Sequence, residues 1–175
     1  EIFTVLGPNG AGKSSLLLAL LGALPDGLAK GEVTLEGRPL ADWSAGERAQ
    51  RVAYVPQVTE LTAPLSVRSV VNMGRRATAG WAPWSSLGRD AVVDEAMART
   101  DVTGLAERRF DALSGGEQRR VLLARALATE ARVVLLDEPA ASLDVGHALA
   151  LYGRLRELAR DGYAVVVVLH DLDDA

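Results

Sequence analysis

Nine consecutive residues near the start of the chain have the types and spacing of a phosphate-binding loop: Gly7, Pro8, Asn9, Gly10, Ala11, Gly12, Lys13, Ser14 and Ser15. The first eight fit G-x-x-x-x-G-K-[ST], whose glycines let backbone N–H groups turn toward phosphate oxygens. The apolar run that follows predicts a helix whose positive N-terminal end faces the same phosphates. Lys13 would reach the β- and γ-phosphates of a nucleotide, and the Ser14 hydroxyl would bind Mg²⁺. We therefore predict a nucleotide site here, rather than a glycine-rich turn with an incidental lysine.

Two acidic residues, Asp137 and Glu138, directly follow an apolar run at residues 133–136. Such runs are typical of buried parallel strands, and ligands in α/β proteins bind beyond the carboxyl ends of those strands. We expect Asp137 to hold Mg²⁺, directly or through water, and Glu138 to orient and deprotonate an attacking water. Acids at a strand end can also simply cap the next helix, but the phosphate-binding loop favours the catalytic interpretation.

A third segment, residues 113–118, reads Leu-Ser-Gly-Gly-Glu-Gln. Ser114, followed three residues later by Glu117, has the pattern of a capping box, and the apolar residues after it predict a helix. Gly115 and Gly116 are costly in a first helical turn, but they make sense if an anion must come very close to the backbone. The segment therefore predicts a second phosphate-binding helix end.

The apolar pattern predicts the elements that must position these residues. Strands alternate with helices, which is typical of an α/β fold with a mainly parallel sheet. Residues 58–112 differ in texture and predict a small helical insertion, with a loop rich in Gly, Pro, Ser and Trp at 77–88. The strands are expected at residues 2–6, 32–36 (turned by 37–39), 52–55, 132–136 and 164–169, and the helices at 16–24 and after Ser66, Asp90, Ser114 and Asp144.

Composition narrows the possible classes of protein. The 175 residues are about one domain's worth, and 49% apolar residues exclude an intrinsically disordered chain. A net charge of −4 disfavours a protein that grips nucleic acid through bulk charge. The absence of cysteine excludes a disulfide scaffold, thiol catalysis and a cysteine-ligated zinc site. The longest apolar run, residues 16–24, is far shorter than the ~20 residues that a membrane helix needs.

Taken in this order, the three motifs resemble the nucleotide-binding subunit of ATP-binding cassette (ABC) transporters, over essentially the whole chain. Gln57 resembles the family's Q-loop glutamine, which contacts Mg²⁺ and the membrane partner. His170 resembles the switch histidine that contacts the γ-phosphate, and residues 142–144, ending at Asp144, resemble the D-loop. The resemblance implies ATP and Mg²⁺ as cofactors. It implies that the catalytic residues are Lys13, Gln57, Glu138 and His170, that the metal is held by Ser14, Gln57 and Asp137, and that the nucleotide is bound by residues 7–15, Ser114, Gly115, Gly116, Glu117 and Asp144.

The resemblance also implies an architecture and partners. It predicts an α/β P-loop NTPase core with a mainly parallel sheet, a small antiparallel β segment and an inserted α-helical subdomain. Residues 1–57 and 119–175 are expected to form the core, and residues 58–118 the helical subdomain with the signature motif. Family members sandwich two ATP molecules between two subunits, head to tail. We therefore expect a homodimer on the cytoplasmic face of the cell membrane, with transmembrane permease subunits, a substrate-binding protein and no nucleic acid.

The cargo is inferred from shorter stretches. Residues 65–75, 121–128 and 169–172 resemble importers of iron–siderophore, haem or cobalamin, with importers of other small solutes as the alternative. ABC ATPases that act in DNA repair or translation are a second class, but they typically carry a coiled coil or a duplicated cassette, and no heptads or basic arm separate Gln57 from Ser114. A P-loop kinase of small molecules would not need the Ser114 helix end.

Several residues are expected to have ordinary roles. His147 is predicted to be a surface helix residue, and Trp81 and Trp84 to pack locally in their loop. Ala140 stands where the family commonly has threonine, which is expected to alter a local hydrogen bond rather than the chemistry. The chain begins inside a strand-like run, so we expect a fragment whose adenine-stacking aromatic lies upstream.

Overall fold

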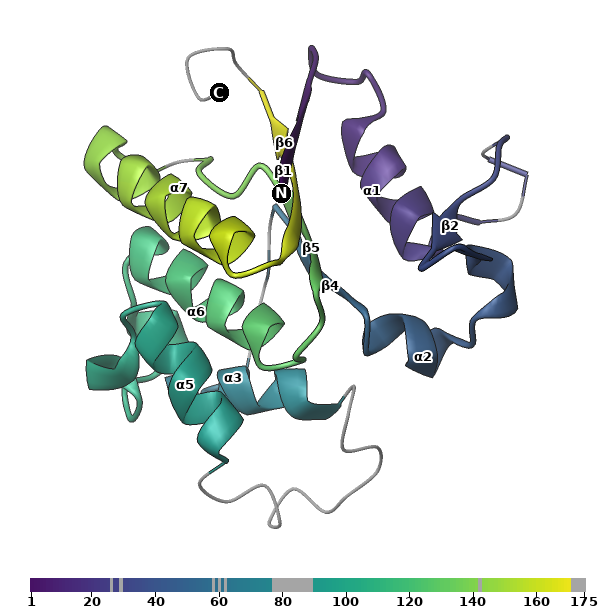
Figure 1. Cartoon of the computed structure of the whole chain (residues 1–175). Coiled ribbons are helices and arrows are strands. Elements are labelled where there is room, and N and C mark those ends of the chain that lie inside the picture. The colour runs from purple at the N-terminus through teal and green to yellow at the C-terminus, as the bar shows by residue number, and fades with distance from the viewer. Residues whose placement is uncertain are drawn as a thin grey trace.

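The computed structural model describes residues 1–25, 27–28, 30–57, 59, 61, 63–76, 90–141 and 143–170. Its centre is a four-stranded parallel sheet with helices on both faces, and a two-stranded antiparallel sheet lies to one side (Figure 1). This arrangement confirms the predicted α/β fold with a mainly parallel sheet and a small antiparallel segment. The loop predicted at 77–88, with Trp81 and Trp84, and Ser142 of the predicted D-loop lie outside the described residues.

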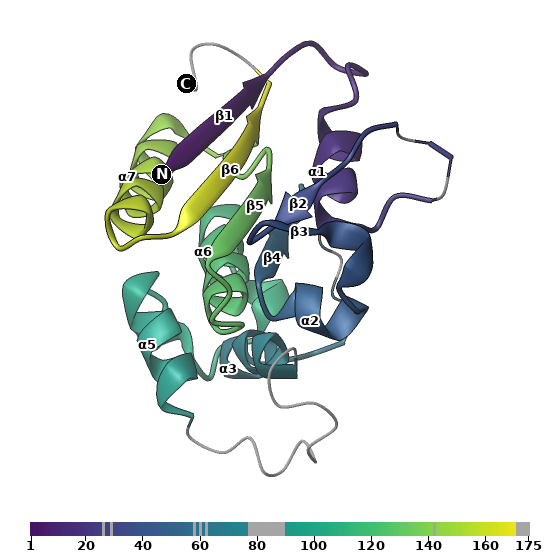
Figure 2. The same ribbon diagram turned by 45° about the vertical axis from the view of Figure 1, so that its right-hand side comes forward.

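The central sheet joins strands from both ends of the chain, and Figure 2 shows them side by side. Neighbouring strands pair in parallel, with Leu6 opposite Leu169, Asp137 opposite Val168, and Val55 opposite Leu136. Their carboxyl ends therefore meet at one edge, from which the segments with the predicted chemistry leave. In spatial order the strands are β1 (Ile2–Leu6), β6 (Ala164–Leu169), β5 (Val133–Asp137) and β4 (Val52–Val55).

Alternating residues of the strands bury against different helices. On one face, Val52, Leu135 and Val168 enclose Leu17 of helix α1 (Lys13–Leu21). On the other face, α6 (Gly115–Leu127) and α7 (Val145–Arg160) cover residues such as Val134 (Figure 1). Each fully buried aliphatic side chain contributes about 1.5–3 kcal/mol. The larger cluster, on the side of α6 and α7, provides most of the core.

Helix α1 begins and ends earlier than the sequence predicted. The expected helix at 16–24 is corrected to Lys13–Leu21. Gly12 has a left-handed backbone and forms the N-cap, so that Lys13 already lies in the first turn. Gly22, with φ 67°, forms the C-cap and stops the helix before the proline at position 25.

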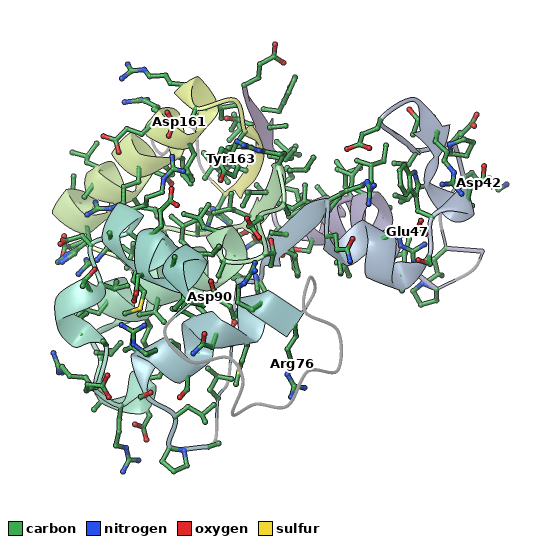
Figure 3. All side chains as sticks on the ribbon, turned by 60° about the horizontal axis from the view of Figure 1, so that its bottom comes forward. Asp42, Glu47, Arg76, Asp90, Asp161 and Tyr163 are labelled. Carbon is green, nitrogen blue, oxygen red and sulfur yellow. The ribbon has the colours of Figure 1, made fainter. Side chains whose placement is uncertain are left out.

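The predicted strand at 32–36 is also corrected. The structure has a short hairpin of β2 (Thr34–Leu35) and β3 (Arg38–Pro39), so the 37–39 segment contains the second strand rather than only a turn. Positive φ angles at positions 36 and 37 give the two-residue turn that joins short antiparallel strands. The hairpin continues into η1 (Leu40–Asp42) and α2 (Ala45–Ala49), which stand to one side of the remaining elements (Figure 3).

The helical segments between β4 and α6 pack on α6, as predicted for a helical insertion. Ser66 caps α3 (Val67–Asn72) and Asp90 caps α5 (Ala91–Arg99), which confirms both predicted helix starts. Four of their valines, together with Met97, are fully buried, namely Val67, Val70, Val71 and Val93. Three 3₁₀ turns complete the described part of this region, namely η2 (Met73–Arg75), η4 (Thr103–Leu105) and η5 (Phe110–Ala112). The division into residues 1–57 and 119–175 against 58–118 stays a prediction.

A helix that crosses a membrane needs about 20 predominantly apolar residues. Among the residues that the structure describes, no helix combines the length and the apolar character needed to cross a bilayer.

Candidate functional site

The phosphate-binding loop connects β1 to α1, as its pattern requires. Gly10 and Gly12 have φ angles of 79° and 88°, which side chains with a Cβ rarely adopt. Lys13 is buried, and its ammonium donates to the carbonyl oxygens of Gly7 at 2.7 Å and Pro8 at 3.2 Å. The loop therefore holds a positive charge in place at the N-terminal end of a helix, where phosphates bind.

Glu138 follows β5 and faces two other motifs. Its Oε2 accepts a 2.5 Å hydrogen bond from the Gln57 side-chain amide, and its Oε1 lies 4.0 Å from the ammonium of Lys13. The φ angle of Glu138 is 43°, in the left-handed region that is strained for a residue with a side chain. A backbone hydrogen bond of 3.0 Å to the carbonyl of Val168 holds this conformation. Strain of this kind is common at active sites.

These residues line a single cavity of about 490 Å³. It opens at the carboxyl edge of the sheet, and its walls come from the β1–α1 loop and the ends of β4 and β5. Its lining combines backbone amides, two hydroxyls, two side-chain amides, one cation and one carboxylate, which suits a phosphate group with a water beside it. The lining residues are Asn9, Gly10, Gly12, Lys13, Ser14, Ser15, Gln57 and Glu138.

Asp137 lies behind Glu138 and is 3% exposed. Its Oδ2 accepts a hydrogen bond from the Tyr54 hydroxyl at 3.3 Å, whereas its buried Oδ1 has no hydrogen-bond partner. An unpartnered buried carboxylate oxygen fits a bound cation, and a Mg²⁺ site needs only one or two carboxylates when substrate phosphates complete it. Among the described residues, no group of three or more His, Cys, Asp or Glu is arranged to hold a metal.

Tyr54 is a site residue that the sequence interpretation missed. Burial, and then the charge and hydrogen bond of Asp137, raise the pKa of Tyr54 from 10.0 to about 12. Its hydroxyl therefore remains a donor to Asp137 over the whole physiological range. The available signal was a tyrosine in the otherwise apolar strand 52–55, but a partner 83 residues away cannot be assigned from that pattern.

His170 reaches the same edge of the sheet but does not line the described cavity. It directly follows β6, whose last residue, Leu169, pairs with Leu6 just before the phosphate-binding loop. The His170 side chain is exposed. The topology thus brings His170 to the same edge as the cavity, and its role as the switch histidine that contacts the γ-phosphate stays a prediction.

The helix end at residues 114–117 has the predicted capping box. The Ser114 hydroxyl accepts from the Glu117 backbone N–H at 3.3 Å, and the Glu117 carboxylate accepts from the Ser114 backbone N–H at 2.8 Å. These hydrogen bonds, led by the Ser114 N–H, lower the pKa of Glu117. None of the residues 114–117 lines the cavity at Lys13. The second predicted anion site therefore lies elsewhere on the same chain.

Asp144 is placed beside that helix end rather than at the Lys13 cavity. It caps α7, because its Oδ1 accepts from the backbone N–H of His147 at 2.9 Å. This hydrogen bond is the largest cause of a lowered pKa at Asp144. The ring of His147 lies against Gly116, so the Asp144 segment and residues 113–118, called here the signature segment, meet through one side chain.

Comparison with known protein families agrees with this arrangement. Residues 1–141 match the ABC transporter family. This chain belongs to that family. The match includes the phosphate-binding loop, Gln57, the Ser114 helix end and both strand-end acids, so the resemblance inferred from the motifs is confirmed.

Individual relatives of this ABC transporter chain are import proteins. It is 52% identical to the hemin import ATP-binding protein HmuV of Streptomyces coelicolor, over 98% of this chain and 60% of that protein. It is 46% identical to the cobalamin import ATP-binding protein BtuD of Halobacterium salinarum, over 97% of this chain and 42% of that protein. The chain thus spans about 60% or less of the length of these curated relatives.

A solved structure agrees with the fold. A metal-chelate type ABC transporter in an inward-facing conformation superposes with a TM-score of 0.81 at 33% identity, over 99% of this chain and 64% of that chain.

Proposed function

We propose that this ABC transporter chain binds and hydrolyses ATP and thereby energises a membrane importer, with hemin as the first candidate cargo. The observation that carries the proposal is the cavity at the carboxyl edge of the sheet. There, Lys13, Gln57 and Glu138 converge from three separate segments around the phosphate-binding loop. The similarity to hemin and cobalamin import ATP-binding proteins supports the transport role.

Binding of the triphosphate would depend on the loop and on Lys13. Backbone N–H groups at the start of α1 face the phosphates, and the Lys13 ammonium neutralises their charge. Because Lys13 is already held by two loop carbonyls, little side-chain entropy is lost when it engages a phosphate oxygen. Ser14, Gln57 and Asp137 are the residues that would hold Mg²⁺, which when bound offsets phosphate charge and orients the phosphate oxygens.

Hydrolysis would use Glu138 as the general base. The carboxylate takes a proton from water as the water oxygen bonds to the γ-phosphorus, and the bond from that phosphorus to the β–γ bridging oxygen breaks to give ADP and phosphate. Gln57 fixes one oxygen of the carboxylate by donating to it at 2.5 Å, which leaves the other to accept the proton. His170, at the end of the neighbouring strand β6, would donate to the γ-phosphate.

Each catalytic site would be shared by two copies of the chain. The Ser114 helix end, which is predicted to bind an anion, does not line the Lys13 cavity of its own chain. In a two-fold dimer this helix end of one chain faces the phosphate-binding loop of its partner, and the reverse holds at the second site. Ser114, Gly115, Gly116, Glu117 and Asp144 would then complete the partner's ATP site.

The membrane partners follow from the import role. We propose transmembrane permease subunits, a substrate-binding protein that delivers the cargo, and a peripheral position on the cytoplasmic face of the cell membrane. Nucleic acid is not proposed as a partner, since the net charge is −4.

Reconstitution tests the whole proposal. The full-length protein is assembled in liposomes with the permease subunits that co-purify with it, and ATP-dependent uptake of hemin is measured against cobalamin and a ferric siderophore. Uptake of hemin that is lost in Lys13→Ala supports the proposal. Uptake of only one of the other two solutes corrects the cargo. ATP hydrolysis by a protein that neither pellets with membranes nor binds the permease overturns the transport role.

A further inference from the structure

The imidazole of His147 occupies the space directly above the backbone of Gly116. A Cβ added at Gly116 would lie 3.1 Å from Cδ2 and 3.4 Å from Cγ of the ring, which is tighter than ordinary van der Waals contact. Asp144 keeps the ring there, because its Oδ2 lies 2.6 Å from the ring Nδ1 while its Oδ1 binds the backbone N–H of His147. The ring is half exposed, yet two bonds to one carboxylate fix it.

The two adjacent glycines of the signature segment therefore differ. A Cβ at Gly115 would meet no atom of the described chain within 4 Å, so nothing there demands glycine for packing. A Cβ at Gly116 would displace the His147 ring, which Asp144 holds, by a few tenths of an ångström. The space beside Gly115 is open to a group from outside the chain, whereas the His147 ring of the same chain fills the space beside Gly116.

A short path of the backbone links this contact to the proposed base. Two backbone hydrogen bonds connect described residues of the segment that begins at Glu138: Ala141 N donates to the Glu138 carbonyl at 3.1 Å, and Leu143 N donates to the Ala140 carbonyl at 3.0 Å. Leu143 packs against the core next to buried Ala140. Glu138 is thus close in sequence to Asp144, the cap of α7, and the described residues between them include hydrogen-bonded and core-packed positions.

We propose that His147 is a positioning residue that holds the Ser114–Gly116 helix end in register with the Glu138–Asp144 segment of the same chain. This inference rests on the proposed function, in which that helix end completes the partner's ATP site. Through the His147 ring, the position of the Glu138–Asp144 segment affects the position of the backbone N–H groups of Ser114–Gly116. In the proposed dimer, these N–H groups face the phosphates that the other chain binds. His147 touches neither nucleotide, and it acts through Gly116 and Asp144.

A positioning role for His147 predicts a loss of kcat without a loss of stability, whereas a merely structural role would lower the thermal unfolding midpoint. In the full-length protein, we expect His147→Ala to lower kcat by roughly 2- to 30-fold, the range of couplings carried by packed contacts. KM for ATP and the thermal unfolding midpoint should stay near those of the wild type, because His147 is half exposed and lies outside the Lys13 cavity. His147→Asn should restore most of kcat, since its amide can bond to Asp144 and still fill the space over Gly116.

A double-mutant cycle isolates the contact. Gly116→Ala should lower kcat, and the double variant with His147→Ala should be no slower than His147→Ala alone, because the new methyl group then fills the space left by the ring. Gly115→Ala is the matched control. It should lower kcat to the same extent whether His147 or alanine is present, since nothing in the described chain faces it.

The outcomes separate this inference from the function on which it rests. An unchanged kcat in His147→Ala overturns the inference while wild-type turnover leaves the proposed function standing. The inference is also overturned if the kcat of the double variant falls by the product of the two single-variant factors. The two residues would then act independently, and Gly116 would have to lack a side chain only because the nucleotide approaches it. A wild-type protein without Mg²⁺-dependent ATP turnover overturns the proposed function and this inference together.

Discussion

Gln57 donates a 2.5 Å hydrogen bond to the Glu138 carboxylate, across 81 residues of sequence. The bond joins the ends of β4 and β5, which are neighbours in the sheet. A donor at this distance fixes the orientation of the carboxylate. Glu138 is thereby held in place for its proposed role as the base, and any partner that moves the Gln57 segment would also move this carboxylate.

Glu138→Gln is expected to retain ATP binding and to lose hydrolysis. The amide keeps the shape of the side chain and can still accept from Gln57, but it cannot take a proton from water. A positioned base contributes roughly 10²–10⁴-fold in rate, and the turnover should fall by about that factor. The variant should accumulate as an ATP-bound dimer in size-exclusion chromatography. Glu157→Gln, on the exposed side of α7, is the control, and a Glu138→Gln turnover within twofold of it would disprove the assignment.

Lys13→Ala is expected to weaken ATP binding and nearly abolish turnover. The substitution removes the one cation that lines the described cavity, and no other lysine lies close in sequence. Lys30→Ala is a matched control, because Lys30 is exposed and is the only other lysine of the chain. Binding of a fluorescent ATP analogue and phosphate release are measured for both. Unchanged hydrolysis in Lys13→Ala would remove the nucleotide site from this loop.

The raised pKa of Tyr54 predicts a loss of stability at alkaline pH. The neutral hydroxyl is favoured in the folded protein, where the pKa is about 12 instead of 10.0. Its stabilising contribution is therefore complete below pH 10 and disappears as the pH rises toward 12. Urea unfolding from pH 9 to 12 should show a steeper loss of stability in the wild type than in Tyr54→Phe. Parallel curves would mean that Tyr54 ionises normally.

Much of the fold could be predicted because its signals are local. Strands 52–55 and 164–169 were predicted with their observed bounds, since a buried strand is a short apolar run between breakers. The helix starts at Ser66, Asp90, Ser114 and Asp144 were predicted correctly, because a cap is formed within a few residues. The end of α1 was predicted too late. The proline at position 25 is a stronger sequence signal for a helix end than Gly22, whose left-handed cap is visible only in the structure.

The relationships that define the site needed the tertiary structure. The order β1-β6-β5-β4 brings Tyr54 beside Asp137, and nothing in a four-residue strand specifies its neighbour. The two-residue strands of the hairpin are too short to give an alternating pattern, so a longer strand was predicted. His147 was predicted to be a surface residue, and it is half exposed, but its contact with Gly116 joins two helices and has no sequence signature.

Ser44 and Ser114 form capping boxes of the same geometry, so a comparison of their alanine variants separates the capping role of a serine from a role in ATP turnover. Ser44 and Ser114 each accept from a backbone N–H three residues later at 3.3 Å, with a glutamate reciprocating at 2.8 Å. Removing an N-cap hydroxyl typically costs about 0.5–2 kcal/mol of stability. Ser44→Ala and Ser114→Ala should both lower the unfolding midpoint in urea, but only Ser114→Ala should lower ATP turnover. Equal turnover in the two variants would reduce Ser114 to a cap.

The separation of Ser114 from the Lys13 cavity predicts that each ATP site is shared between chains. Full-length Lys13→Ala and Ser114→Arg variants should each be inactive, since every site of either homodimer carries one defect. After subunit exchange, half of the dimers are mixed, and each mixed dimer has one site with both defects and one with neither. About a quarter of wild-type turnover should therefore return if the sites are independent, by two-fold symmetry.

The complementation experiment has a second readout, because strong cooperation between the two sites would hide the recovery of turnover. Trapped ATP is therefore counted in mixed dimers that are purified through different tags on the two variants. One occluded ATP per mixed dimer is expected, held by Lys13 of one chain and the Ser114 helix end of the other. If both motifs served a single chain, every site in the mixture would remain defective, because each chain carries one of the two substitutions. Purified mixed dimers with neither turnover nor occluded ATP would therefore contradict the shared site.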